Sequence, residues 1–184
     1  MPLTNKPQFR IIALCGYPNS GKTTVQHMLH DHGYQSIDDA APLRRAAEAL
    51  YGLPVGITDT QEGKASRVKI GDKEYCVRDL IGSMGEAGVR LHGPSFKIDR
   101  IIPYLNPTQY YTMGSCRGEE AKYWKHHGAN IIEIQRPNIP IPLHARDRYN
   151  PDYIDYTIHN NTDLSTLRQQ VANIVQHIRT STPK

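Results

Sequence analysis

This sequence has no hydrophobic run that approaches the length of a membrane span. The apolar stretch nearest the N-terminus, residues 11–15, is shorter than the hydrophobic region of a secretory signal peptide. The three cysteines, Cys15, Cys76 and Cys116, are odd in number and do not have metal-binding spacing. We therefore expect no membrane anchor and no disulfide framework, and we expect a reducing cytoplasm as the location.

A strong charge of one sign is also missing, because 22 Lys and Arg residues oppose 18 Asp and Glu residues and leave a net charge of +4. This mild positive balance suits small polyanionic ligands, but it predicts neither a nucleic-acid polymer nor a membrane as a partner. The chain shows no Ser-His-Asp or Cys-His arrangement and no catalytic-loop Asp of the protein-kinase type. Its 184 residues suit one compact domain with a hydrophobic core.

What the chain does have is a complete P-loop, Gly-Tyr-Pro-Asn-Ser-Gly-Lys-Thr, at residues 16–23. The loop follows the apolar run and opens into a helix-like stretch at residues 24–32, which is the context in which this pattern binds phosphate. Its glycines let successive N–H groups turn inward, and the helix adds its positive dipole end. Lys22 is expected to reach the β- and γ-phosphates, and Thr23 to ligate Mg²⁺. We assign ATP binding to Gly16, Asn19, Ser20, Gly21, Lys22, Thr23 and Thr24.

A glycine-rich turn that binds nothing is the alternative reading of this loop. From residue frequencies, the pattern would arise by chance about once in a hundred or more chains of this size. The strand before it and the helix after it make an accident rarer still.

The rest of the chain alternates between strand-like and helix-like segments, which predicts a parallel sheet covered by helices on both faces. This is a three-layer α/β fold of the P-loop class. The expected strands are residues 10–15, 34–37, 110–113, 130–134 and 156–158, with a small hairpin or irregular lead-in at 68–77. The expected helices are residues 24–32, 39–50, 77–91, 95–102, 119–127 and 163–178. The apolar face of the second helix is expected to include Ala46 and Leu50, and that of the last helix is expected to include Leu164. Residues 53–69 and 136–151 are expected to be loops.

Other P-loop classes need motifs that the chain lacks. A GTPase requires an Asn-Lys-x-Asp motif that recognises guanine. The only Asn-Lys here, at residues 5–6, precedes the P-loop. The Asp-x-x-Gly at residues 79–82 lies within a helical pattern, and a motor ATPase or helicase is normally longer. A small kinase remains. Cations spread over several elements fit this class, because two sets of phosphates must be neutralised, although solvated surface charge is the alternative for each of them. These cations are Arg44, Arg45, Lys64, Arg67, Arg78, Arg117 and Arg136.

Later segments carry a more specific resemblance. They are residues 41–45 (Ala-Pro-Leu-Arg-Arg), 77–81 (Val-Arg-Asp-Leu-Ile), 114–121 (Gly-Ser-Cys-Arg-Gly-Glu-Glu-Ala), 128–137 (Gly-Ala-Asn-Ile-Ile-Glu-Ile-Gln-Arg-Pro) and 158–162 (Ile-His-Asn-Asn-Thr). Together with the P-loop, and in this order from about Arg10 to Ile178, the chain resembles the bacteriophage deoxynucleoside monophosphate kinases. The resemblance implies an adenylate-kinase-like domain with an acceptor-binding insertion at about 38–92 and a lid at about 136–151. It also implies transfer of the ATP γ-phosphoryl group to a deoxynucleoside monophosphate, in the host cytoplasm if a phage encodes the chain. A phosphate acceptor needs no general base, since its second pKa near 6 leaves it largely ionised.

The resemblance also implies roles for individual residues. Lys22, Arg117 and Arg136 would act on the transferring phosphate, and Thr23 would hold Mg²⁺. Asn160 and Asn161 would lie beside the adenine of ATP. The acceptor nucleotide would be bound by Asp38, Arg44, Arg45, Lys64 and Arg78, with Arg45 the weaker candidate.

Two departures from the family pattern stand out. Ser115 replaces an Asp two residues before Arg117, so Mg²⁺ would rest on Thr23, phosphates and water, with Asp38 or Asp39 in support. The lid motif, usually His-x-Ser-Glu, reads His-Ala-Arg-Asp at residues 144–147. Two alternatives stay open: a kinase of the same fold for another phosphorylated small molecule, of the phosphomevalonate or dephospho-coenzyme A type, and a non-catalytic P-loop protein. The accepted bases are not fixed, and a homodimer is possible.

Overall fold

The computed structural model of the chain describes residues 9–181, apart from the side chain of Arg146. The packing of the backbone divides these residues into two compact units. The first contains residues 9–37 and 101–181, and the second is Asp38–Arg100. No helix within residues 9–181 is long and apolar enough to cross a membrane.

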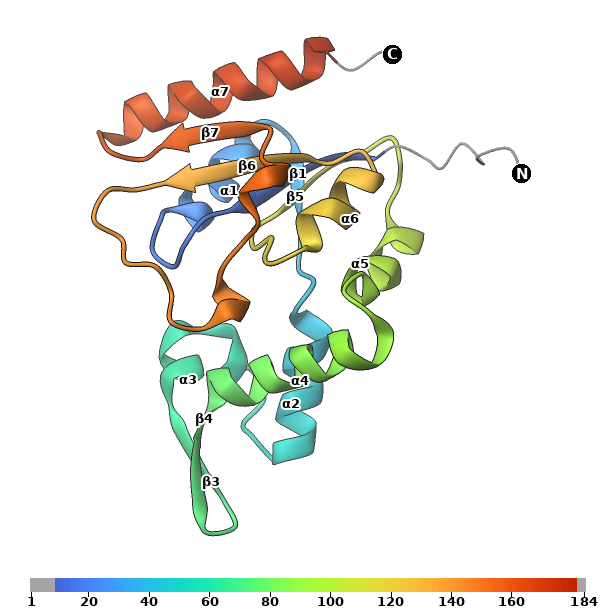
Figure 1. Cartoon of the computed structure of the whole chain (residues 1–184), viewed down its shortest axis with the longest axis vertical. Helices are drawn as coiled ribbons and strands as arrows, with labels where there is room; N and C mark the ends of the chain where they lie inside the picture. The colour runs from blue at the N-terminus through green and yellow to red at the C-terminus, as the bar shows by residue number, and fades with distance from the viewer. Residues whose placement is uncertain (1–8, 182–184) are drawn as a thin grey trace. The chain divides into compact units, whose positions relative to one another are not determined.

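The first unit is built on a parallel sheet of five strands: β1 (Arg10–Cys15), β2 (Tyr34–Ile37), β5 (Tyr110–Met113), β6 (Asn130–Gln135) and β7 (Tyr156–His159). They lie side by side in the order β2-β5-β1-β6-β7 (Figure 1). Five of the six residues of β1 are buried, which is the pattern of a strand covered on both faces. Because β1 is the middle strand, the P-loop that follows it begins at the centre of the sheet.

Helices cover both faces of this sheet, as the alternating pattern predicts. On one face, α1 (Lys22–Asp31) and α7 (Leu164–Ser181) pack against β1 and β6. Ile12 of β1 and Ile132 of β6 belong to this core. On the other face α6 (Glu120–His126) packs against β6 and buries Trp124. Three short 3-10 helices complete the unit: η2 (Ile102–Tyr104), η3 (Ala145–Asp147) and η4 (Pro151–Tyr153).

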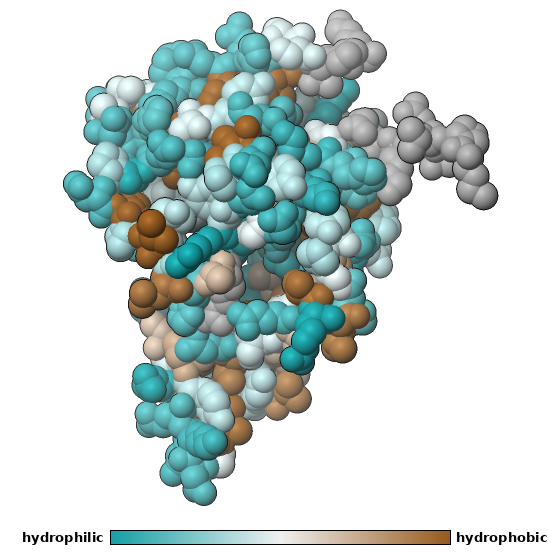
Figure 2. All heavy atoms as spheres, viewed as in Figure 1, coloured by the Kyte–Doolittle hydropathy of each residue, from teal (hydrophilic) through white to brown (hydrophobic). Residues whose placement is uncertain are grey.

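The second unit is mainly helical, with α2 (Ala41–Tyr51), η1 (Ile57–Asp59), α3 (Gln61–Ala65), α4 (Val77–His92) and the start of α5 (Phe96–Ile101). The antiparallel hairpin of β3 (Arg67–Ile70) and β4 (Lys73–Cys76) projects from it. This hairpin is rich in charged side chains, and Figure 2 shows its end as a hydrophilic surface. Helix α4 runs close to α5, because a Cβ added to Gly88 would lie 2.4 Å from the Phe96 ring.

The predicted fold class and all five sheet strands are confirmed, and so is a hairpin at 67–76. Three residues that were expected on apolar helix faces are exposed: Ala46, Leu50 and Leu164. Leu50 is 67% exposed and Leu164 is 58% exposed, because each lies at the end of its helix. The expected loop at 53–69 contains η1 and α3, and the one at 136–151 contains η3. The acceptor-binding role of residues 38–92 and the lid role of residues 136–151 stay predictions.

Candidate active site

The P-loop has a backbone that only small residues allow. Gly16 has φ 137° and Gly21 has φ 106°, both in the range that favours glycine. A Cβ on Gly16 would lie 2.6 Å from the backbone carbonyl oxygen of Ile134. A Cβ on Gly21 would lie 2.4 Å from the side-chain nitrogen, Nδ2, of Asn160. The loop is thus fitted closely between the ends of β6 and β7. A side chain at either glycine would therefore clash with these neighbouring atoms.

Lys22 lies at the start of α1 and folds back over the loop. Its Nζ donates hydrogen bonds to the carbonyl oxygens of Gly16 (2.7 Å) and Tyr17 (2.8 Å). Burial, together with the nearby positive charge of Arg117, lowers the pKa of Lys22 to about 8. Burial also raises the pKa of the neighbouring Cys15 thiol to about 12, so this cysteine is an unreactive core residue. The Thr23 and Thr24 hydroxyls are on exposed residues of the first turn of α1.

Two polar side chains at the base of the P-loop are Ser20, which belongs to the loop, and Asn160, which follows β7. Ser20 is 2% exposed, and its Oγ has no hydrogen-bond partner in the described part of the chain. The Asn160 side chain donates to the carbonyl oxygen of Ser20 (2.8 Å), and its backbone N–H donates to the carbonyl oxygen of Gln135 (2.7 Å). Asn160 therefore ties the P-loop to β6. An unpaired buried hydroxyl is costly, so the Ser20 position is consistent with a loop that takes up a polar ligand.

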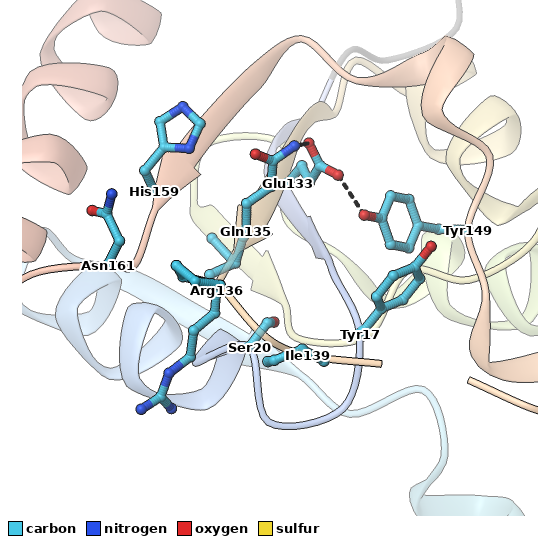
Figure 3. Close-up of a pocket in the computed structure, with 11 residues that line it drawn as sticks. Tyr17, Ser20, Glu133, Gln135, Arg136, Ile139, Tyr149, His159 and Asn161 are labelled. Atoms are coloured by element: carbon cyan, nitrogen blue, oxygen red, sulfur yellow. Dashed lines mark hydrogen bonds between the residues drawn. The ribbon is translucent and has the colours of Figure 1, made fainter. Parts of the chain in front are cut away.

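A cavity of about 420 Å³ opens beside the loop. Figure 3 shows the side chains that surround it, which come from the P-loop, from the end of β6 with the segment after it, and from the end of β7. The lining includes both aromatic and polar groups, as is common for pockets that bind a small organic molecule. The lining residues are Tyr17, Ser20, Glu133, Ile134, Gln135, Arg136, Pro137, Ile139, Tyr149, His159 and Asn161.

A carboxylate, Glu133, is buried in the wall of this cavity with only 8% of its surface exposed. It accepts hydrogen bonds from the Tyr149 hydroxyl, from Gln135 Nε2 (2.8 Å) and from Thr157 Oγ1 (3.3 Å). The Tyr149 ring lies against the Tyr17 ring of the P-loop, with centroids 5.3 Å apart. Burial and the hydrogen bond to Glu133 raise the pKa of Tyr149, which keeps the phenol neutral. The sequence analysis missed Glu133, although an acid inside the apolar strand 130–134 was a visible signal.

The two arginines assigned to the transferring phosphate are both held near the loop. Arg136 Nη1 donates to the carbonyl oxygen of Asn19 (3.3 Å). Arg117 Nε donates to Ser115 Oγ (2.8 Å), and its Nη1 pairs with Asp147 Oδ1 (2.9 Å). Asp147 also lies close enough to Lys22 to favour its charged form. The structure thus gathers Lys22 with Arg117 and brings one acid of the segment 144–147 to them.

In the second unit, the acceptor candidates form a network of ion pairs. Arg44 pairs with Asp38 and, at 3.1 Å, with Asp59. Arg45 pairs with Asp59 and Glu48. Glu48 also accepts hydrogen bonds from Thr58 and Gly56 within the unit. Arg44 and Arg45 thus each pair with two acids of the same unit.

Lys64 and Arg78 lie near Arg44. Burial lowers the pKa of Lys64, and the positive charges of Arg44 and Arg78 lower it further. Asp38 and Asp59, which pair with Arg44, act in the opposite direction and raise this pKa. The three cations are therefore an anion-binding candidate for a phosphate that replaces these carboxylates as their partner. Arg78 Nη2 donates to Gln61 Oε1 (2.9 Å). Arg67 is separate from them and pairs with Glu74 across the exposed hairpin.

No protein-family model matches the sequence, and the search of curated proteins finds no match. Solved structures do match. A dephospho-CoA kinase from Campylobacter jejuni aligns with a TM-score of 0.53 at 12% identity, over 94% of this chain and 98% of that one. The protein TT1252 from Thermus thermophilus aligns with a TM-score of 0.52 at 15% identity, over 92% and 98% of the two chains. The chain shares their three-layer α/β fold, in which helices flank a parallel five-stranded sheet. At such low identity the likeness establishes the fold alone.

Within this fold, the described residues contain no group of three or more His, Cys, Asp or Glu side chains that could hold a metal ion. The glycine-lined turn and the unpaired Ser20 hydroxyl fit a phosphate group bound there.

Proposed function

We propose that the protein is an ATP-dependent kinase that transfers the γ-phosphoryl group to a nucleoside monophosphate, with a deoxynucleoside monophosphate as the first candidate. The observation that carries this proposal is the P-loop itself. Its two positive-φ glycines, its inward Lys22 and its unpaired Ser20 hydroxyl lie beside a cavity large enough for a nucleoside.

In this proposal the cavity receives the nucleoside of ATP. Arg136, which follows β6, and Asn161, which follows the neighbouring β7, line it, and Tyr17 adds an aromatic ring. The family resemblance puts Asn160 and Asn161 beside adenine. In the structure Asn161 lines the cavity, whereas the Asn160 side chain holds the P-loop and would shape the site indirectly.

Transfer would rest on positioning and charge. Lys22 would leave the carbonyl oxygens of Gly16 and Tyr17 to bind the β- and γ-phosphates, and Arg117 would turn from Asp147 to the same group. Arg136 would neutralise charge that develops on the transferring phosphoryl group. Mg²⁺, held by the Thr23 hydroxyl when bound, would neutralise further phosphate charge.

The acceptor phosphate would bind to Arg44, Lys64 and Arg78. Burial and, after it, the charges of Arg44 and Arg78 lower the pKa of Lys64. A doubly charged phosphate bound by these three cations would favour the charged form of Lys64. Such a phosphate is itself the nucleophile and needs no general base, which agrees with the lack of a base motif in the chain.

A second candidate is a kinase of the same fold for another phosphorylated small molecule. The likeness to a dephospho-CoA kinase favours it as much as the first candidate, because the fold does not select the acceptor. A non-catalytic nucleotide-binding protein is the third, and the missing acid at Ser115 is the feature that favours it.

ADP release, measured with ATP, Mg²⁺ and a panel of acceptors, separates the three candidates. The panel contains deoxynucleoside and ribonucleoside monophosphates, phosphomevalonate and dephospho-coenzyme A. Activity with a nucleoside monophosphate supports the first candidate, and activity only with another acceptor supports the second. ATP binding without turnover on any acceptor supports the third.

Two variants test the mechanism in the same assay. Lys22→Ala should abolish transfer, while Lys122→Ala, an exposed lysine on α6, should leave it unchanged. Arg136→Ala should reduce turnover by roughly a hundredfold or more, and Arg168→Ala on the exposed face of α7 is its control. Near-normal turnover of Lys22→Ala would contradict the proposed chemistry.

A further inference from the structure

The end of β6 carries two polar side chains on the same side of the strand, Glu133 and Gln135. Both line the cavity, and Gln135 Nε2 donates to Glu133 Oε2 at 2.8 Å. A carboxylate accepts hydrogen bonds and has no N–H to donate. The Gln135 amide must therefore turn its nitrogen, and not its oxygen, toward Glu133.

Glu133 is itself held in place. It is buried, and the Tyr149 hydroxyl and Thr157 Oγ1 reach the same carboxylate from two other segments. A reversed Gln135 amide would place its oxygen against these carboxylate oxygens, and two acceptors in contact repel each other. The orientation of Gln135 is thus set by a group that the rest of the cavity wall fixes.

The consequence lies on the far side of the Gln135 amide. Figure 3 shows its oxygen turned away from Glu133, toward the side of the cavity where His159 and Asn161 lie. Among the side chains that the structure describes, which do not include that of Arg146, none donates a hydrogen bond to this oxygen. The cavity therefore offers a fixed acceptor to whatever enters it.

We propose that Gln135, oriented by Glu133, selects the base of the phosphoryl donor by accepting a hydrogen bond from the 6-amino group of adenine, and so favours adenine over guanine. This inference rests on the proposed function, which assigns the cavity to the donor nucleoside. The 6-position of adenine carries an amino group, whereas that of guanine carries a carbonyl oxygen. The 6-carbonyl oxygen of guanine would face the side-chain oxygen of Gln135. Both are hydrogen-bond acceptors, so they would repel each other. Glu133 acts as a positioning residue and Gln135 as the specificity residue.

Calorimetric titration with three triphosphates tests the proposal without any need for turnover. They are ATP, GTP and purine riboside triphosphate, which has hydrogen at the 6-position. The wild-type protein should bind ATP roughly three- to tenfold more tightly than purine riboside triphosphate, and at least about tenfold more tightly than GTP.

Variants then show whether Gln135 is the cause. In Gln135→Ala, ATP and purine riboside triphosphate should bind with equal affinity, because the acceptor for the amino group is gone. In Glu133→Gln, the Gln135 amide can turn over, since a glutamine at 133 can donate to it, and the preference for ATP over GTP should fall toward one. Lys122→Ala, an exposed lysine of α6 that does not line the cavity, is the control and should keep the wild-type preference.

The ratio of affinities is the readout, because a general loss of packing weakens all three ligands together and leaves the ratio unchanged. Equal binding of the three triphosphates by the wild type would overturn the inference, and so would a wild-type ratio in Gln135→Ala. If ADP release from ATP is intact in either case, the proposed function survives. If the wild type binds none of the three, both fail.

Discussion

Replacing Gly16 by alanine is the sharpest test of the P-loop geometry. The new Cβ would lie 2.6 Å from the Ile134 carbonyl oxygen and 2.7 Å from Ser20 Oγ, both closer than an ordinary carbon–oxygen contact. The Ile134 oxygen belongs to the backbone of β6, which is paired with β1 and β7, so it cannot yield without loss of sheet hydrogen bonds. The φ of 137° adds strain for any residue with a side chain.

The protein contains a matched control for the strain. Gly33, between α1 and β2, also has a positive φ of 80°, but a Cβ there would meet nothing within 4 Å. Gly33→Ala should cost about 1 kcal/mol, since it imposes a left-handed conformation on alanine and nothing else. Gly16→Ala should cost about 4 kcal/mol, of which about half is backbone strain and about half is the overpacked contact.

Urea unfolding followed by tryptophan fluorescence measures the free energy of unfolding of both variants, and it reports on the structural unit that contains the P-loop. The chain has a single tryptophan, Trp124, which is 1% exposed and lies on α6 in the unit that contains the P-loop. Gly16→Ala should also lose ATP binding, because the loop must move away from β6 to admit the methyl group. A loss of stability no greater than that of Gly33→Ala would refute the close approach of the loop to Ile134.

Three further predictions concern charge. Because the pKa of Lys22 is lowered to about 8 and bound phosphates favour its charged form, ATP affinity measured by calorimetry should fall by up to about tenfold per unit above pH 8, and an identical fall in Lys22→Met would contradict this. Asp147→Asn removes the anion that pairs with Arg117, so ATP without Mg²⁺ should bind about two- to fivefold more tightly; unchanged or weaker binding would count against it. Hydrogen bonds, first of all from the Thr58 hydroxyl, lower the pKa of Glu48 to about 2 from a usual value near 4.5, so its stabilisation is complete above pH 4.5 and is lost as the pH falls through 2. Glu48→Gln should therefore reduce hydrogen-exchange protection of the α2 amides at pH 7, with a difference that shrinks toward pH 2, and a constant difference would argue against this role.

The sequence was informative where structure is local. The P-loop lies between a buried strand and a helix, so spacing alone located it, and the short apolar runs located the five strands. Periodicity failed at Leu50 and Leu164, because it identifies the apolar side of a helix but not where the neighbouring layer ends. The position of the hairpin also followed from local patterns.

The contacts that shape the cavity could not be predicted in this way. Glu133 and Tyr149 are 16 residues apart, and the intervening segment contains no strand and only one short 3-10 helix to fix their separation. Arg117 and Asp147 are 30 residues apart, and they meet only because both follow strands that end at the same edge of the sheet. Such pairs depend on the path of irregular backbone, which has no period in the sequence.

The hydrogen bonds of the segment 136–151 limit which part of it could move as a lid. Gly118 bonds through its N–H to the Arg148 carbonyl oxygen (2.7 Å) and through its own carbonyl oxygen to the Asn150 N–H (3.3 Å). Tyr149, between these two residues, is held by Glu133 and packs on Tyr17. A segment tied by backbone hydrogen bonds and by a buried hydroxyl opens at a higher free energy than a solvated loop. If this segment acts as a lid, we therefore expect the closing motion to be confined to residues 137–147. A phosphate bound by Arg117 would then have to break the Arg117–Asp147 ion pair at the end of that stretch.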